Sequence, residues 1–179
     1  DFGEYTCECT RLSCPQESRC IVVIIQAYPE PDMFAAGQYR FDLTIPGDPV
    51  PKARPRVLNG HGVTPAQTRS REDYIRSLFT QEYPDAKPLE CPVEITMRFY
   101  MPDHRARDFD NLAKLVTDAL NGLAYKDDRY ITSAIIYKIL PSIYVPGVKG
   151  ARKRIKGDPL TDRHGTPYEP HTQVRIMAD

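Results

Sequence analysis

Features that mark membrane proteins and disordered acidic chains are missing from this 179-residue sequence, which also contains no tryptophan. Its longest apolar run, Ile21–Ile25, is far shorter than the roughly 20 residues that a membrane-spanning helix needs. No basic segment precedes that run, so it makes a poor secretory leader. With 41% hydrophobic and 27% charged residues, the composition is typical of a globular protein with no membrane association.

Net charge is also lacking, because 24 Lys and Arg balance 24 Asp and Glu, and this excludes a uniformly basic nucleic-acid-binding surface. The balance is uneven along the chain. Residues 1–32 contain two basic and six acidic side chains, which leaves 22 basic and 18 acidic side chains for residues 33–179. Four of those 18 acids stand in two tight pairs, Asp108/Asp110 and Asp127/Asp128, so the remaining surface permits a polyanionic partner.

Cysteine is scarce beyond residue 20. The five cysteines are Cys7, Cys9, Cys14, Cys20 and Cys91. The spacing of the first four matches no standard zinc knuckle and no histidine lies near them, but a zinc site and a disulfide knot both remain open. We favour a third interpretation, in which residues 1–32 are an N-terminal extension, disordered or foreign to the native domain, because the chain begins with Asp and a patterned strand follows Met33. The predicted domain is then 33–179.

The pattern of apolar residues predicts two helices and four strands, separated by connections rich in the 17 prolines. The predicted elements are strands at Tyr39–Pro46, Val93–Phe99, Ile131–Leu140 and Gln173–Met177, and helices at 70–83 and 112–120. Ser70 is expected to cap the first helix, and residues 141–171 are expected to form a loop. Because Ile131–Leu140 is apolar on both faces, we expect it in the centre of the sheet. The order predicts an α+β fold, a small mixed sheet with two helices on one face.

Carboxylates cluster around the second helix, in the segment RDFDNLAKLVTDALNGLAYKDDRYI at residues 107–131. Asp108 and Asp110 are two apart just before the helix, and in extended backbone such residues point the same way, about 6.5–7 Å apart. Oxygen ligands of this kind suit a hard cation. Lys114 lies one helical turn beyond Asp110, and Asp128 follows the helix and its turn at Gly122. Taken singly, each aspartate could equally cap a helix or stand in a solvated turn.

Covalent catalysis has no support, because no serine or cysteine is paired with one of the four histidines in a recognisable motif. A loop with the sequence GDPVPKARPRV, at residues 47–57, is held extended by its prolines and carries three cations outward. These are Lys52, Arg54 and Arg56, and we expect them to contact phosphates. A merely solvated basic loop is the alternative.

The loop, the acidic segment and a following strand with Lys138 together resemble the RusA type of Holliday-junction resolvase, over about residues 40–140. The resemblance implies a RusA-like homodimer of bacterial or phage origin, located in the cytoplasm. It implies an endonuclease that depends on Mg²⁺, with Mn²⁺ as a substitute, and that nicks four-way DNA junctions symmetrically in recombination and repair. The family's essential carboxylates match Asp108, Asp110 and Asp128, which would bind the metal, and its helix lysine matches Lys114.

Two features depart from the family's pattern: the cysteine-rich head and a long basic loop at residues 147–157. Both bear on the DNA-binding surface and the dimer edge. Two other functions remain open: a non-catalytic DNA-binding protein that keeps the fold, and a metal-dependent nuclease that acts on branched DNA in general.

Overall fold

The structure is a computed structural model that describes residues 40–53, 56–58, 61–63 and 65–178. The expected N-terminal extension, with its four cysteines, lies outside the described residues, and so does Arg54. No helix in the described residues is long and apolar enough to cross a membrane.

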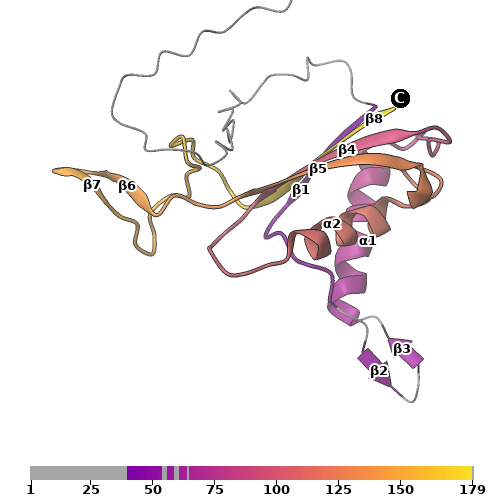
Figure 1. Cartoon of the computed structure of the whole chain (residues 1–179), viewed down its shortest axis with the longest axis horizontal. Coiled ribbons are helices and arrows are strands. Elements are labelled where there is room, and N and C mark those ends of the chain that lie inside the picture. The colour runs from indigo at the N-terminus through magenta and orange to yellow at the C-terminus, as the bar shows by residue number, and fades with distance from the viewer. Residues whose placement is uncertain (1–39, 54–55, 59–60, 64, 179) are drawn as a thin grey trace, which may run out of the picture. The chain divides into compact units, whose positions relative to one another are not determined.

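Four strands form the central sheet (Figure 1). They are β1 (Phe41–Pro46), β4 (Val93–Tyr100), β5 (Ile131–Ile139) and β8 (His171–Ala178). Their order in the sheet is β1-β8-β4-β5, in which β4 and β5 are parallel and the other two pairs are antiparallel. The alternation of apolar and polar residues in β1 becomes a strictly alternating pattern of buried and exposed side chains. The predicted mixed sheet is thereby confirmed.

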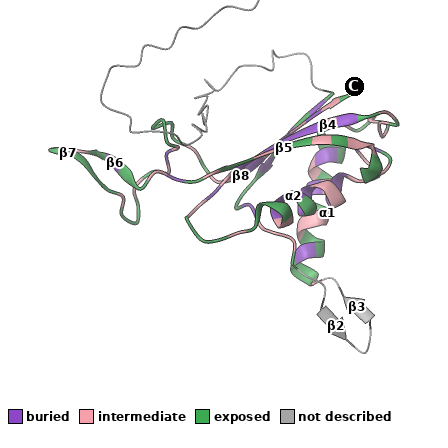
Figure 2. Ribbon diagram, in the orientation of Figure 1, coloured by how far each residue is buried: buried purple, intermediate pink, exposed green. Residues whose placement is uncertain are grey.

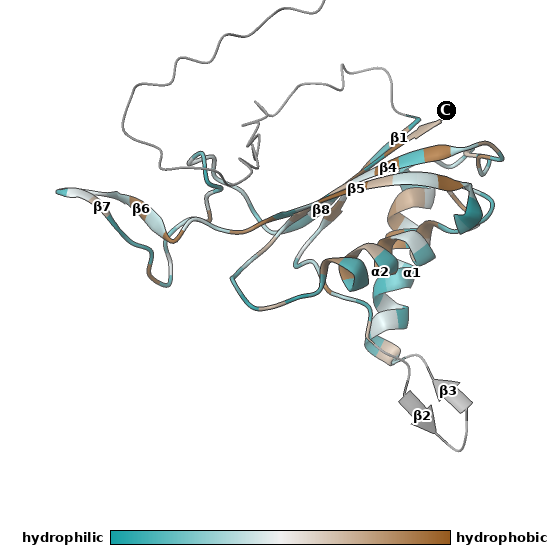
Figure 3. Cartoon of the chain, viewed as in Figure 1, coloured by the Kyte–Doolittle hydropathy of each residue, from teal (hydrophilic) through white to brown (hydrophobic). Residues whose placement is uncertain are grey.

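Two helices, α1 (Ala66–Glu82) and α2 (Phe109–Leu120), lie on one face of the sheet, as predicted (Figure 1). The buried faces of these helices and of the strands make one core, which appears purple in Figure 2. Figure 3 shows brown, hydrophobic segments alternating with teal, hydrophilic segments in both helices. The predicted cap at Ser70 was wrong. The amides of Thr68 and Arg69 already donate to the carbonyl of Pro65, which holds the cap position five residues earlier.

The expectation that residues 131–140 form a central strand was also wrong, because β5 is at the edge of the sheet. Ile135 and Tyr137 of β5 are 41% and 45% exposed. They stand beside Thr96 and Arg98 of β4, on the face that the helices do not cover. A strand that is apolar on both faces is expected to be buried on both faces. The pattern does not show whether its own chain or another molecule covers those faces.

Two small hairpins lie outside the central sheet. One is β2 (Arg56–Leu58) with β3 (His61–Val63), and the other is β6 (Tyr144–Gly147) with β7 (Gly150–Lys153). The second corrects the prediction that residues 141–171 are only a loop. Its short strands escape detection in the sequence because Gly147 and Gly150 interrupt the alternation on both sides of the tip.

Candidate active site and nucleic-acid interface

Asp108 and Asp110 stand together at the N-terminus of α2. Asp108 holds the N-cap position with extended backbone (φ −69°, ψ 131°), but its side chain does not cap the helix. Its Oδ2 instead accepts a hydrogen bond from Asn111 Nδ2 at 3.3 Å. Asp110 is exposed in the first turn, and within the described residues no hydrogen bond or ion pair occupies its carboxylate. The positive end of the helix dipole stabilises both anions. Because no basic side chain in the described residues forms an ion pair with either carboxylate, both are available to a cation.

The loop that leads into this helix is held by two cationic side chains. Arg107 forms an ion pair with Asp103, with 2.7 Å between Nη1 and Oδ1. Lys138, near the end of β5, donates from Nζ to the carbonyl oxygen of Arg107 at 2.8 Å. The residue directly before Asp108 is therefore tied to the C-terminal end of β5.

Asp128 lies in a different place, before the first residue of β5. It begins the 3-10 helix η1 (Asp128–Tyr130), which Asp127 caps by accepting from the amide of Arg129 at 3.0 Å. Burial raises the pKa of Tyr125, and the negative charges of Asp118 and Asp128 raise it further. The Tyr125 hydroxyl donates to the carbonyl of Thr117 at 2.7 Å. Asp128 thus lies toward the C-terminal half of α2.

The two groups of carboxylates are separated by the length of β5. Asp108 adjoins the residue that Lys138 contacts, whereas Asp128 precedes Ile131, and a strand from Ile131 to Lys138 spans about 23 Å. Consistent with this, no three His, Cys, Asp or Glu side chains gather into a group that could hold a metal anywhere in the described part of the chain. One chain therefore brings Asp108 and Asp110 together but leaves Asp128 at the opposite end.

Asp118, a residue that the sequence analysis did not select, joins two of the predicted lysines. Lys114 is exposed, with its Nζ 3.9 Å from Asp118 Oδ1. Lys52 forms ion pairs with Asp118 and with Glu72, the latter at 2.7 Å, and its side chain is 18% exposed. Burial alone would lower the pKa of Lys52, but the hydrogen bonds with Asp118 and Glu72 outweigh burial and raise the pKa. The sequence could have indicated this ion pair, because Lys114 and Asp118 are four residues apart and so lie on the same face of the helix.

The proline-rich loop is tied to both helices through Lys52 and Arg71. The Lys52 amide donates to the carbonyl of Asn111 at 2.8 Å. Arg71 of α1 donates from Nη2 to the carbonyl of Pro46 at 3.0 Å. Lys52 is therefore engaged by two carboxylates and holds this loop against the start of α2. Arg54 lies outside the described residues, and Arg56 is described only as the first backbone position of β2.

Phe109 is a further candidate that the sequence analysis missed. It stands between the two aspartates and is 60% exposed. The sequence could have indicated that Phe109 is exposed, because Phe109 falls outside the buried stripe formed by Leu112, Leu115 and Val116. An exposed aromatic ring beside two carboxylates at a helix start could stack on a nucleotide base.

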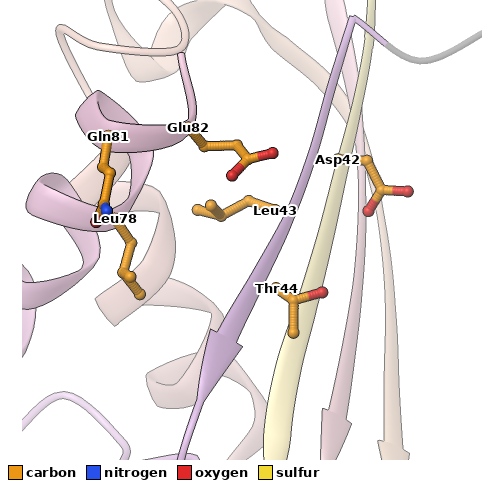
Figure 4. A pocket seen from close by; sticks show the side chains of 6 residues that line it. All are labelled: Asp42, Leu43, Thr44, Leu78, Gln81 and Glu82. Atoms are coloured by element: carbon orange, nitrogen blue, oxygen red, sulfur yellow. The ribbon is translucent and has the colours of Figure 1, made fainter. Parts of the chain in front are cut away.

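A pocket of about 490 Å³ lies apart from these residues, between β1 and the end of α1 (Figure 4). In the figure, Leu43 points from β1 toward the helix, whereas Asp42 and Thr44 point away from it. The pocket contains none of the candidate residues, so we do not assign it to their chemistry.

Comparisons with known proteins found one matching family model and several similar proteins. The family model described as Endodeoxyribonuclease RusA matches residues 46–149. The crossover junction endodeoxyribonuclease RusA of Escherichia coli (strain K12) is 28% identical over 113 residues, covering 63% of this chain and 88% of that protein. The uncharacterized protein YqaN of Bacillus subtilis (strain 168) is 28% identical over 120 residues, covering 53% of this chain and 84% of that protein. The matched region contains Asp108, Asp110, Asp118 and Asp128 and ends at the tip of the β6–β7 hairpin.

Proposed function

The chain belongs to the RusA family of endodeoxyribonucleases, and on that premise we propose that it is a metal-dependent endonuclease that resolves four-way DNA junctions by paired nicks. The observation that carries this proposal is the pair Asp108 and Asp110 at the N-terminus of α2. Both side chains are exposed, and no basic side chain neutralises either of them among the described residues.

The donor set fits a hard divalent cation. Carboxylate oxygens are the ligands that Mg²⁺ prefers, and Mn²⁺ accepts the same ligands. Asp108, Asp110 and Asp128 would hold the metal, which when bound would activate water and neutralise charge on the phosphate. Nearby, Lys114 has an exposed ammonium group one turn along α2, where it would contact the scissile phosphate.

The distance between Asp128 and the other two carboxylates favours a homodimer in which two chains share each site. The outer edge of β5 pairs with no other strand in the described residues, and such an edge is a template for pairing with a second chain. If two copies pair β5 antiparallel across a two-fold axis, the start of one β5 lies beside the end of the other. Asp128 of each chain would then approach Lys138, and with it Asp108, of its partner.

Exposed apolar side chains support the same arrangement. Ile135 and Tyr137 lie on the helix-free face of β5, and the Arg98 guanidinium lies 5.6 Å from the centroid of the Tyr137 ring. In a continuous sheet through the dimer, side chains of the second copy's β5 would flank these two residues on the same face. Each site would then contain carboxylates from both copies, and two such sites related by symmetry suit paired nicks on opposite strands.

The test is a cleavage assay on matched DNA substrates. The purified protein is incubated with a synthetic four-way junction, with a linear duplex of the same sequence, and with a flap substrate, in Mg²⁺ and in excess EDTA. We expect symmetric nicks in the junction, in Mg²⁺ only. Equal cleavage of flap and junction would replace the proposal with a general branched-DNA nuclease. Junction binding without cleavage in Mg²⁺ or Mn²⁺ would replace it with a non-catalytic binding protein.

A further inference from the structure

The hairpin β6–β7 concentrates positive charge and exposed apolar surface. Residues 141–157 contain five basic side chains and no acidic one. The basic residues are Lys149, Arg152, Lys153, Arg154 and Lys156. Tyr144, Val148 and Ile155 are among the large hydrophobic residues that the structure exposes, and Val148 at the tip is fully exposed. Figure 2 shows the outer part of the hairpin as exposed, and Figure 3 shows hydrophilic colour at its tip.

Only part of this charge is neutralised. Arg152 forms a two-point ion pair with Asp158, with distances of 2.7 Å and 2.6 Å. Lys149, Lys153 and Lys156 are exposed, and no ion pair engages them within the described residues. Three lysines therefore remain available to an anionic partner.

The register of the hairpin separates an anchored face from a free face. Val145 is opposite Arg152, and both belong to the anchored face, where Val145 is buried and Arg152 binds Asp158. Tyr144 is opposite Lys153, and both point to the other face, where Tyr144 is 62% exposed. The free face thus places an aromatic ring beside a cation.

The base of the hairpin is held firmly. The amide of Ser142 donates to the carbonyl of Thr161 at 2.7 Å, and the amide of Arg154 donates to the carbonyl of Ile143 at 2.8 Å. Asp158 accepts from the amide of Ile155 at 2.8 Å as well as from Arg152. These bonds join the base of the hairpin to the loop at residues 158–161.

We propose that the hairpin β6–β7 is a second DNA-binding element, which enters a groove of a duplex arm of the branched substrate. A two-stranded β-ribbon fits the major groove of B-form DNA. Lys149, Lys153 and Lys156 contact phosphates, while Tyr144 and Val148 contact the sugars and base edges. This inference rests on the proposed function, since it takes branched DNA as the substrate. The region that the family model matches ends at residue 149, so β7 and the basic residues after it lie beyond it.

The test compares two double variants that each remove two positive charges. One is Lys149→Gln with Lys153→Gln, in the hairpin. The control is Arg40→Gln with Lys87→Gln, two exposed residues at the other end of the sheet, near the start of β4. Neither variant touches the candidate active site. Junction affinity is measured in Ca²⁺ over a range of salt concentrations, and nicking is measured in Mg²⁺.

We expect the hairpin variant to bind the junction on the order of tenfold more weakly, with the log–log salt slope reduced by about 1.8. Its nicking rate at saturating DNA should equal that of the parent, and the control variant should change the slope little. A hairpin variant with the parent's affinity and slope would overturn the inference while leaving the proposed function intact. A parent protein that neither binds nor cuts junctions would instead overturn the proposed function.

A second measurement uses the unaltered protein. Lysine acetylation is compared with and without junction DNA, and with anionic lipid vesicles. We expect DNA to protect Lys149 and Lys153, and to leave Lys87 reactive. Protection by vesicles and not by DNA would assign the hairpin to a membrane surface and overturn the proposal.

Discussion

The Nζ of Lys138 lies 2.8 Å from the carbonyl oxygen of Arg107, which joins the end of β5 to the residue before Asp108. This bond places the start of α2 at one end of the edge strand. Asp128 lies before the other end of the same strand. The contact therefore shows why one chain does not assemble the three carboxylates that the sequence suggests as a unit.

The first prediction concerns Asp110→Asn. Asparagine has nearly the same shape, and the Asp110 carboxylate makes no hydrogen bond or ion pair in the described residues, so the melting temperature should change little. Removing one negative charge should lower metal occupancy and reduce nicking by at least about 10²-fold, while junction binding in Ca²⁺ stays or tightens. Melting, binding and nicking are measured on one preparation. A variant that nicks at the parent rate would remove Asp110 from the mechanism.

The second prediction tests whether two chains share each site. Asp110→Asn and Asp128→Asn should each be inactive alone, because each alters both sites of a homodimer. After mixing and subunit exchange, about half of the dimers are mixed and each contains one intact site, so about a quarter of the parent's sites return. Nicking of a junction after mixing measures this. If each site belongs to one chain, mixing restores no activity, and the shared-site proposal is wrong.

Lys52 is expected to act on stability more than on DNA binding. Lys52→Met removes the ammonium group that Glu72 shares with Asp118, and it leaves Asp118 with only the longer ion pair to Lys114. This should cost about 1–3 kcal/mol of the free energy of unfolding. Urea denaturation measures this loss. The salt slope of junction binding should stay near the parent's, because the Lys52 ammonium is already engaged. If the salt slope falls by about 0.9 and the stability is unchanged, Lys52 contacts a DNA phosphate and this prediction is wrong.

The same ion pairs predict a pH dependence. The pKa of Lys52 is raised above its ordinary value of 10.5 in the folded chain, so its contribution to stability is complete below about pH 10.5. As the pH rises through the folded-state pKa, this contribution is lost. Urea denaturation between pH 9 and pH 12 should therefore show a steeper loss of stability for the parent than for Lys52→Met. Parallel curves would contradict the raised pKa.

Phe109→Ala tests the exposed ring between the aspartates. Loss of stacking on a base should weaken junction binding by about 1–3 kcal/mol, which is measured by titration in Ca²⁺. The melting temperature should hardly change, because the ring is 60% exposed. Phe109→Tyr, which keeps an aromatic face, serves as the control and should bind as the parent does.

Local sequence patterns predicted most of the regular structure. Alternation predicted β1 and β4, and the stripe that includes Leu112 and Leu115 predicted α2, because a strand or helix with one buried face must place its apolar residues at that element's own period. The turn after α2 was equally readable, since Gly122 adopts φ +77°. Errors arose where the pattern was ambiguous, as at the start of α1 and in the short strands β6 and β7.

The sequence by itself also determined which side chains can do chemistry: the two aspartates at the helix start, the helix lysine and a third aspartate after the turn. Tertiary structure decided their distances. Two residues 20 apart, Asp108 and Asp128, are brought together or held apart by the direction in which α2 and β5 run, and this direction follows from the parallel pairing of β5 with β4. Parallel strand pairing depends on contacts between residues that are distant in sequence, and a local sequence pattern does not predict such contacts. The same is true of Lys52, whose charge was visible in the sequence but whose partners, Glu72 and Asp118, meet it only when α1 packs beside α2.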